Sequence, residues 1–112
     1  MSLTRAFKDT VKARADQDPA FRKALIAEAI NCFAEGDIVT MKILLRDYIN
    51  ATDGFEVVAK AIGKTAKGLM RSLSANGNPQ VDTLAPLVAY ATKRERIGSF
   101  TAVGNVPSVP HC

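Results

Sequence analysis

Apolar residues recur at helical spacing along most of this chain, and clusters of turn residues interrupt them. Leu3, Phe7 and Val11 lie four residues apart. This spacing predicts a polar helix over residues 4–16.

Two further helices are predicted between Asp18 and a turn-like segment at 50–54. Asp18 and Pro19 favour a helix start, because an aspartate carboxylate accepts hydrogen bonds from free amides and proline fits the first turn. Gly36 ends this helix and Asp37 caps the next one. The apolar face of the first helix is Phe21, Leu25, Ala29, Ile30 and Phe33. The apolar stripe of the second is Ile38, Met41, Leu44, Leu45, Tyr48 and Ile49, with Lys42, Arg46 and Asp47 expected to face outward.

The following segment predicts two short helices and one longer one. The short helices cover Phe55–Ile62 and Thr65–Leu73, and a dense cluster of turn residues follows at 74–79. The longer helix runs from about Val81 to Arg94, and Pro86 either lies in its first turn or kinks it. The side chains expected to be buried on this helix are Val81, Leu84, Leu87, Val88 and Ala91.

These elements predict an all-α protein, because no alternation of helices and strands suggests a sheet. We expect an N-terminal helical extension at 1–36, a helix-turn-helix core at 37–97 and an irregular tail at 98–112. Leu, Ile, Val and Ala must provide most of the core, since the chain is 47% hydrophobic but only 6% aromatic.

The two short helices meet the steric requirements of a helix-turn-helix. A small residue is needed where the helices nearly touch, and glycine is favoured where the turn needs a positive φ. Ala59 is the small residue, and Gly63 follows four residues later as the turn. The side chains expected to fill the angle between the helices are Val58, Ile62, Leu69 and Leu73. Two amphipathic helices in a plain helical bundle are the alternative interpretation.

The second short helix has features of a DNA recognition helix. Such a helix needs small or hydrogen-bonding residues near its N-terminus, and cations that meet phosphate or guanine. Thr65 can cap the helix, and Lys64 and Thr65 lie at the N-terminus, where free amides favour phosphate. Lys67 and Arg71 are four residues apart and share the outward face with Ala66 and Met70. The residues predicted to contact DNA are Lys64, Thr65, Ala66, Lys67, Met70 and Arg71.

The formal net charge of +4 lies entirely in the second half of the chain. Residues 1–53 carry eight basic and eight acidic side chains, whereas residues 54–112 carry seven basic and three acidic ones. A basic half is typical of a polyanion-binding face, although an ordinary solvated surface can have the same composition.

Several other classes of protein are disfavoured by the sequence. No apolar run approaches the ~20 residues of a membrane span, and the N-terminal segment lacks the apolar region of a secretory signal. Cys32 and Cys112 lie far apart and form neither a disulfide framework nor a paired metal-ligand spacing. We therefore expect a protein of the reducing cytoplasm.

Motifs for catalysis and for nucleotide binding are also missing. Gly63-Lys64-Thr65 resembles the end of a P-loop, but Val58 stands where that loop needs its first glycine. His111 is the only histidine, and beside Cys112 it gives too few ligands for a structural zinc site. No serine or cysteine has the context of an activated nucleophile. We therefore expect no enzymatic activity, no metal and no cofactor.

Five segments between about Asp18 and Ile97 carry a family resemblance: DPAFRKALIAEA, EGDIVTMKILLRDYINAT, GFEVVAKAIGK, SANGNP and DTLAPLV. With them the chain resembles the lambda-repressor-like (Xre-type) helix-turn-helix proteins. Within that family it is similar to the HigA-like antidote proteins of addiction modules and to related transcriptional regulators.

The resemblance implies a five-helix DNA-binding core over about Asp37–Arg94, operator binding as a homodimer, and often a small ribonuclease toxin as partner. By motif position, it implies that DNA is faced by Thr65, Ala66, Lys67, Met70 and Arg71. Two positions depart from the family pattern. Phe55 stands where these repressors usually have a glutamine that anchors a phosphate, and Pro86 is unusual in the final helix.

Two functions are therefore predicted, and they belong to different classes. The first is a DNA-binding transcriptional regulator, as a repressor or as the antitoxin of a toxin–antitoxin module. The alternative is an interaction module that binds a toxin or another protein without sequence-specific DNA binding, with the segment before Asp37 as its partner surface. The basic second half favours the first, whereas Phe55 and the few donors on the recognition helix favour the second.

Overall fold

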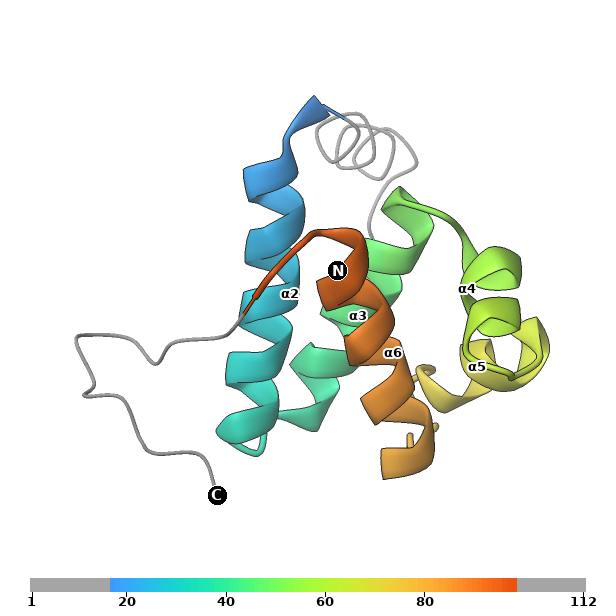
Figure 1. Ribbon diagram of the computed structural model, residues 1–112. Helices are drawn as coiled ribbons and strands as arrows, with labels where there is room; N and C mark the ends of the chain where they lie inside the picture. The colour runs from blue at the N-terminus through green and yellow to red at the C-terminus, as the bar shows by residue number, and fades with distance from the viewer. Residues whose placement is uncertain (1–16, 99–112) are drawn as a thin grey trace, which may run out of the picture.

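The computed structural model describes residues 17–98, which form five α-helices and no strand (Figure 1). The helices are α2 (Pro19–Ala34), α3 (Ile38–Ala51), α4 (Phe55–Ala61), α5 (Ala66–Ser72) and α6 (Val81–Arg94). The all-α prediction is confirmed for this part of the chain. The predicted helix over 4–16 and the predicted tail from residue 99 onward lie outside the described residues. No helix within residues 17–98 is long and apolar enough to cross a membrane.

Polar side chains start three of the helices at the positions that the sequence predicts. The carboxylate of Asp18 accepts a hydrogen bond from the Phe21 amide at 3.1 Å, with Pro19 as the first helical residue. The carboxylate of Asp37 accepts from the Thr40 amide at 3.1 Å, and this bond lowers the pKa of Asp37. The Thr65 hydroxyl caps α5 in the same manner. Each cap satisfies one of the amides that a helix start leaves without an intrahelical acceptor.

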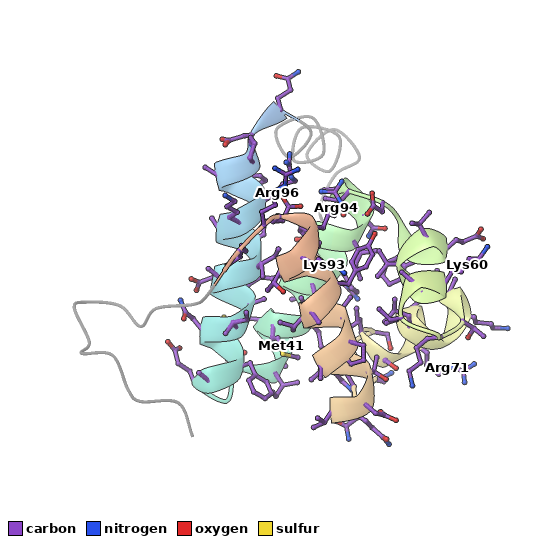
Figure 2. The ribbon with its side chains drawn as sticks, in the orientation of Figure 1. Met41, Lys60, Arg71, Lys93, Arg94 and Arg96 are labelled. Carbon is purple, nitrogen blue, oxygen red and sulfur yellow. The ribbon has the colours of Figure 1, made fainter. Side chains whose placement is uncertain are left out.

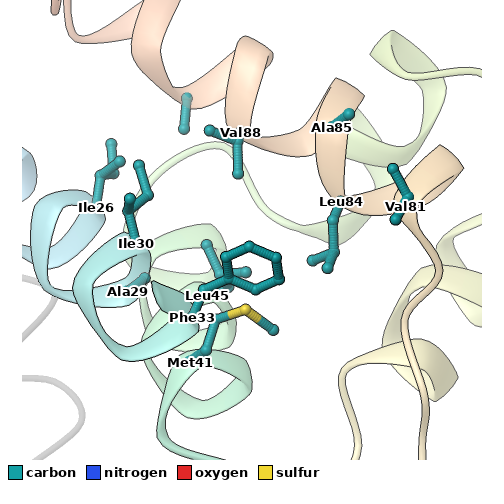
Figure 3. Close-up of a pocket in the computed structure, with 11 residues that line it drawn as sticks. Ile26, Ala29, Ile30, Phe33, Met41, Leu45, Val81, Leu84, Ala85 and Val88 are labelled. Carbon is teal, nitrogen blue, oxygen red and sulfur yellow. The ribbon is translucent and has the colours of Figure 1, made fainter. Parts of the chain in front are cut away.

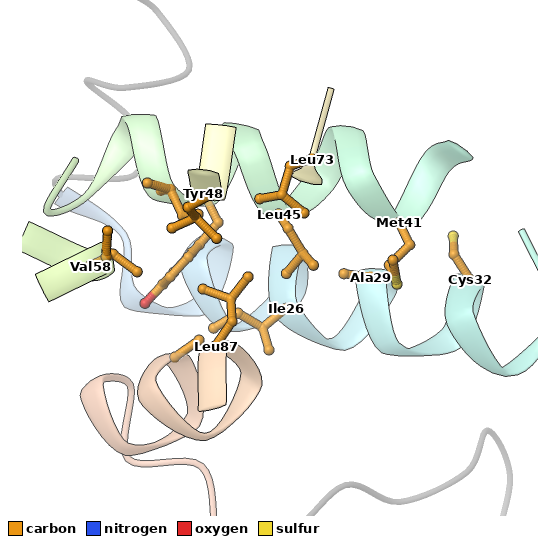
Figure 4. Close-up of a cluster of buried hydrophobic side chains, with 13 residues drawn as sticks. Ile26, Ala29, Cys32, Met41, Leu45, Tyr48, Val58, Leu73 and Leu87 are labelled. Carbon is orange, nitrogen blue, oxygen red and sulfur yellow. The ribbon is translucent and has the colours of Figure 1, made fainter. Parts of the chain in front are cut away.

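The core lies where α2, α3 and α6 meet, and α4 connects it to α5 (Figure 1). α2 packs along α3 and also contacts α6, whereas α4 contacts α3, α5 and α6. Buried side chains from all five helices form one cluster, which also includes Leu73 at the C-terminal end of α5 (Figure 4). Its members are Ile26, Ala29, Cys32, Met41, Leu45, Tyr48, Ile49, Val58, Ala59, Leu69, Leu73, Leu87 and Ala91.

A polar network at one edge of this core was not predicted from the sequence. Glu95, which follows α6, is 4% exposed and accepts from the Tyr48 hydroxyl at 2.7 Å, from Arg22 Nε at 2.9 Å and from Arg94 Nη1 at 2.6 Å. Arg94 also pairs with Asp53 through two nitrogens, at 2.9 and 3.2 Å. The network therefore links α2, α3, α6 and the turn before α4.

One expectation about the helices needs correction, and one of the two alternatives for Pro86 is excluded. The resemblance implied five helices within about 37–94, but this range contains four, and the fifth is α2. Pro86 lies inside α6, beyond its first turn. The amide hydrogen that proline lacks would have bonded the carbonyl of Asp82, which is an exposed residue where water can replace the bond.

The prediction that Lys42 faces outward is wrong. The Lys42 residue is only 6% exposed, because the loop between α5 and α6 covers this part of α3. Its ammonium donates to three carbonyls of that loop. Arg46, also expected to face outward, is half-buried and donates to the Leu73 carbonyl at 3.4 Å. Periodicity within α3 could not reveal this cover, which comes from residues about thirty positions later in the chain.

The prediction that Val81 is buried is also wrong, because Val81 is 75% exposed. It lies at the start of α6, on the rim of an apolar groove of about 430 Å³ between α2 and α6 (Figure 3). α2 contributes Ile30 and Phe33 to this groove, and Phe33 is 51% exposed. Leu84 and Val88 line the opposite wall and are only partly buried. The apolar face of α6 is thus wider than the surface that packs against it.

Candidate nucleic-acid interface

The connection from α4 to α5 is a tight turn with a left-handed glycine at Gly63, the position at which the sequence predicts the turn. Gly63 has φ +73°, and the amides of Gly63 and Lys64 donate to the carbonyls of Lys60 and Ala59, at 3.3 and 2.8 Å. This pair of bonds ends α4 in a Schellman motif, which requires a left-handed residue at the Gly63 position. A Cβ on Gly63 would meet nothing within 4 Å. The backbone conformation, and not the available space, therefore makes glycine favourable there.

The side chains predicted to fill the angle between α4 and α5 are buried in the core or packed against it. Val58, Ala59, Leu69 and Leu73 are fully buried in the core, and Ile62 is half-buried against it. Ala59, the small residue predicted at the contact between the helices, is 1% exposed. These contacts fix α5 against α4 and leave one face of α5 exposed.

The predicted DNA-contacting residues divide into two groups. Lys67, Met70 and Arg71 lie on the exposed face of α5, and Met70 is 48% exposed. Ala66 does not share this face fully, because it is half-buried and packs on the core. Lys64 is half-buried and its ammonium lies 3.8 Å from the Asp82 carboxylate.

Thr65 and Gly68 are linked in the first turn of α5. The Thr65 hydroxyl accepts from the Gly68 amide at 3.0 Å. A Cβ on Gly68 would lie 2.9 Å from that oxygen, so a larger residue would push the cap aside. This role of Gly68 was not predicted from the sequence, because it depends on the distance between the Gly68 backbone and the Thr65 hydroxyl.

The positive charge of the second half is divided between two regions (Figure 2). Lys60 and Arg71 extend from the side of the molecule formed by α4 and α5, whereas Lys93, Arg94 and Arg96 gather around the C-terminal end of α6. Arg94 is neutralised by its ion pairs with Asp53 and Glu95. Within residues 17–98, no ion pair engages Lys60, Lys67 or Arg71. These three cations are available to an anionic ligand.

Phe55 begins α4 and is half-buried against the core. Gly54 precedes it as the N-cap, and no side chain caps this helix start. The exposed side chains in the first turn are the acidic Glu56 and the apolar Val57. The amide that the family pattern places at this point for a phosphate contact therefore has no equivalent at Phe55 or Glu56.

The described residues contain little that suggests metal or nucleophile chemistry. Within residues 17–98, no group of three or more His, Cys, Asp or Glu side chains could hold a metal ion. The Cys32 thiol is buried, and burial together with the nearby Glu28 carboxylate raises its pKa, which disfavours the thiolate. His111 and Cys112 lie outside the described residues.

Comparison of the chain with protein-family models, curated proteins and solved structures finds no match.

Proposed function

We propose that this protein is a DNA-binding transcriptional regulator that uses α5 as its recognition helix. The observation that carries the proposal is the α4–Gly63–α5 unit, which exposes Lys67, Met70 and Arg71 on one face of α5. An arginine on such a face can pair with guanine, a lysine can meet phosphate, and a methionine can contact a thymine methyl group. Lys60 on α4 adds a cation on the same side of the molecule, and it too has no ion pair within residues 17–98.

The family resemblance extends this proposal. It favours a lambda-repressor-like core over about Asp37–Arg94, a homodimer on the operator, and a role as an antitoxin with a ribonuclease toxin as partner in the cytoplasm. Four of the five described helices, α3 to α6, lie in that range, and α4 and α5 are its second and third helices. The dimer and the toxin are supported by the sequence motifs alone.

The test is a salt titration of binding, by fluorescence anisotropy, to a labelled duplex taken from the DNA upstream of the gene. A DNA-binding protein should lose affinity steeply between 50 and 200 mM salt, on the order of 10-fold or more, because phosphate contacts release counterions. An equally long duplex from within an unrelated gene is the control for sequence preference. Absence of any complex at low salt would exclude the regulator.

The second candidate is the interaction module, and the apolar groove between α2 and α6 favours it. Phe33 and Val81 are large apolar side chains on its rim, and both are more than half exposed. The apolar face of an amphipathic helix from a partner protein suits such a lining, which contains no polar side chain. If the protein binds no DNA, this groove is the surface on which Phe33→Asp should abolish binding of a purified partner while Arg71→Ala leaves it unchanged.

A further inference from the structure

Lys42 is a buried cation whose partners are backbone carbonyls. Its Nζ donates to the carbonyl oxygens of Ser74 at 2.9 Å, Ala75 at 3.2 Å and Gly77 at 2.8 Å. An ammonium group has three hydrogens, so these three bonds use its full donor capacity. No carboxylate of the described residues forms an ion pair with it. The loop carbonyls therefore replace water around this charge.

The loop that Lys42 binds is attached to the C-terminal end of α5. The Ser74 amide and hydroxyl both donate to the Arg71 carbonyl, at 3.2 and 2.7 Å. Gly77 folds back onto the same turn, where a Cβ would collide with the carbonyl oxygens of Arg71 and Ser72. Positive charge near the last carbonyls of a helix is also electrostatically favourable. Lys42 thus holds the loop against α3, and the same loop is hydrogen-bonded to the carbonyl of Arg71 at the end of α5.

We propose that Lys42 is a positioning residue that fixes the C-terminal turn of α5, and with it Arg71, in the orientation required for DNA binding. The inference rests on the proposed function, because it assigns to Lys42 control of the same surface. Lys42 does not itself reach DNA, since its donors are already used and it is buried. Arg46 supports the same turn through its bond to the Leu73 carbonyl.

The decisive variant is Lys42→Met, which keeps most of the side-chain volume and removes the three donors. Lys23→Met is the matched control, because it removes the same charge from an exposed position on α2. We expect Lys42→Met to weaken DNA binding by about five- to thirtyfold. The dependence of log affinity on log salt should keep its slope, because no phosphate contact is lost. Lys23→Met should leave both quantities unchanged.

Hydrogen exchange separates the positioning role from DNA binding itself. In Lys42→Met the backbone amides between Arg71 and Gly77 should exchange faster, while those of α2 remain protected. Unchanged affinity, or a salt slope shallower by about one ion, would overturn the positioning role. If the wild type binds no DNA, the proposed function fails, but the exchange pattern still decides whether Lys42 holds this turn.

A measurement on the wild-type protein covers the case in which Lys42→Met does not fold. The ammonium hydrogens of Lys42 should be visible by NMR as slowly exchanging protons, unlike those of the exposed Lys67. Addition of the labelled duplex should shift the ammonium signal of Lys67 and leave that of Lys42 in place. Rapid exchange of the Lys42 ammonium with water would contradict the three carbonyl bonds and the proposal with them.

Discussion

The carboxylate of Glu95 combines two opposing influences on its protonation. Burial raises the pKa of Glu95, but hydrogen bonds from Tyr48, Arg22 and Arg94 outweigh it, so the pKa lies below the ordinary value of 4.5. A carboxyl group whose pKa falls on folding binds fewer protons in the folded than in the unfolded state. Its contribution to stability is therefore complete above pH 4.5 and is lost as the pH falls through the lower folded-state pKa.

Glu95→Gln tests this contribution. At pH 7 the variant should lose about 2–3 kcal/mol of unfolding free energy, because Arg22 and Arg94 lose a buried anionic partner. Urea denaturation at pH 7 and at pH 3 measures the difference from wild type. The difference should shrink at pH 3, which lies below the ordinary pKa of 4.5, because the unfolded wild type then binds a proton at Glu95 that the folded state resists. An equal difference at both pH values would show that the Glu95 charge does not carry the effect.

Gly63 provides a second prediction for a single residue. Gly63→Val should lower the unfolding free energy by about 1–3 kcal/mol, because a β-branched residue is strained at the positive φ of this turn. Gly98→Ala is the control, since a Cβ there meets nothing within 4 Å and no positive φ is required. Thermal unfolding followed by circular dichroism measures both. A melting temperature of Gly63→Val equal to that of wild type would mean that this turn is not rigid in solution.

At the scale of elements, the sequence correctly predicted the helix starts and ends that depend on residues close together in the chain. Asp18, Asp37 and Thr65 cap helices within three residues of themselves, and Gly63 ends α4 through bonds to the preceding turn. These features depend on neighbours in the chain, so residue type and spacing reveal them. The local pattern likewise indicated the burial of Val58, Ala59, Leu69 and Leu73 on the two short helices.

The features that the sequence did not reveal depend on residues far apart in the chain. The burial of Lys42 depends on carbonyls 32 to 35 positions later, and Glu95 meets Arg22 across 73 positions. Val81 fits the apolar stripe of α6 but lies beyond the part of that stripe which packs against α2. A helical periodicity shows which face is apolar, but not how much of it another element covers.

The end of α6 offers a prediction at the same scale. Arg96 has φ +58°, and the amides of Arg96 and Ile97 bond the carbonyls of Lys93 and Thr92. α6 thus ends in the same motif as α4, but with arginine at the left-handed position.

Arg96→Gly should raise the unfolding free energy by about 0.5–1 kcal/mol, because glycine adopts the left-handed conformation with little strain. Lys93→Gly, in the last turn of the same helix, should instead destabilise the protein by about 1 kcal/mol or less. Equilibrium urea denaturation of both variants measures these changes. A destabilised Arg96→Gly would mean that the arginine side chain contributes more than its backbone strain costs.

At the scale of the whole molecule, the distribution of charge matters more than its total. The net charge of +4 suggests a uniform attraction to a polyanion. In the structure, however, Lys60 and Arg71, which have no ion pair within residues 17–98, are separate from Lys93, Arg94 and Arg96 at the end of α6. If DNA binds on α5, replacing a lysine on α5 should weaken DNA binding more than replacing a lysine at the end of α6.

Lys67→Ala and Lys93→Ala remove the same charge from two exposed positions, one on α5 and one in the last turn of α6. Lys67→Ala should weaken binding to all duplexes alike and make the slope of log affinity against log salt shallower by about one ion. Lys93→Ala should leave that slope unchanged.

Arg71→Ala should cost about 1–3 kcal/mol of binding free energy and relax the preference at one base pair, if this arginine pairs with guanine. All three variants should retain the helical circular dichroism and melting temperature of wild type, because their side chains are exposed and unpaired within residues 17–98. Equal losses of affinity for Lys67→Ala and Lys93→Ala would indicate non-specific attraction to the whole protein, and α5 would then not be the recognition helix.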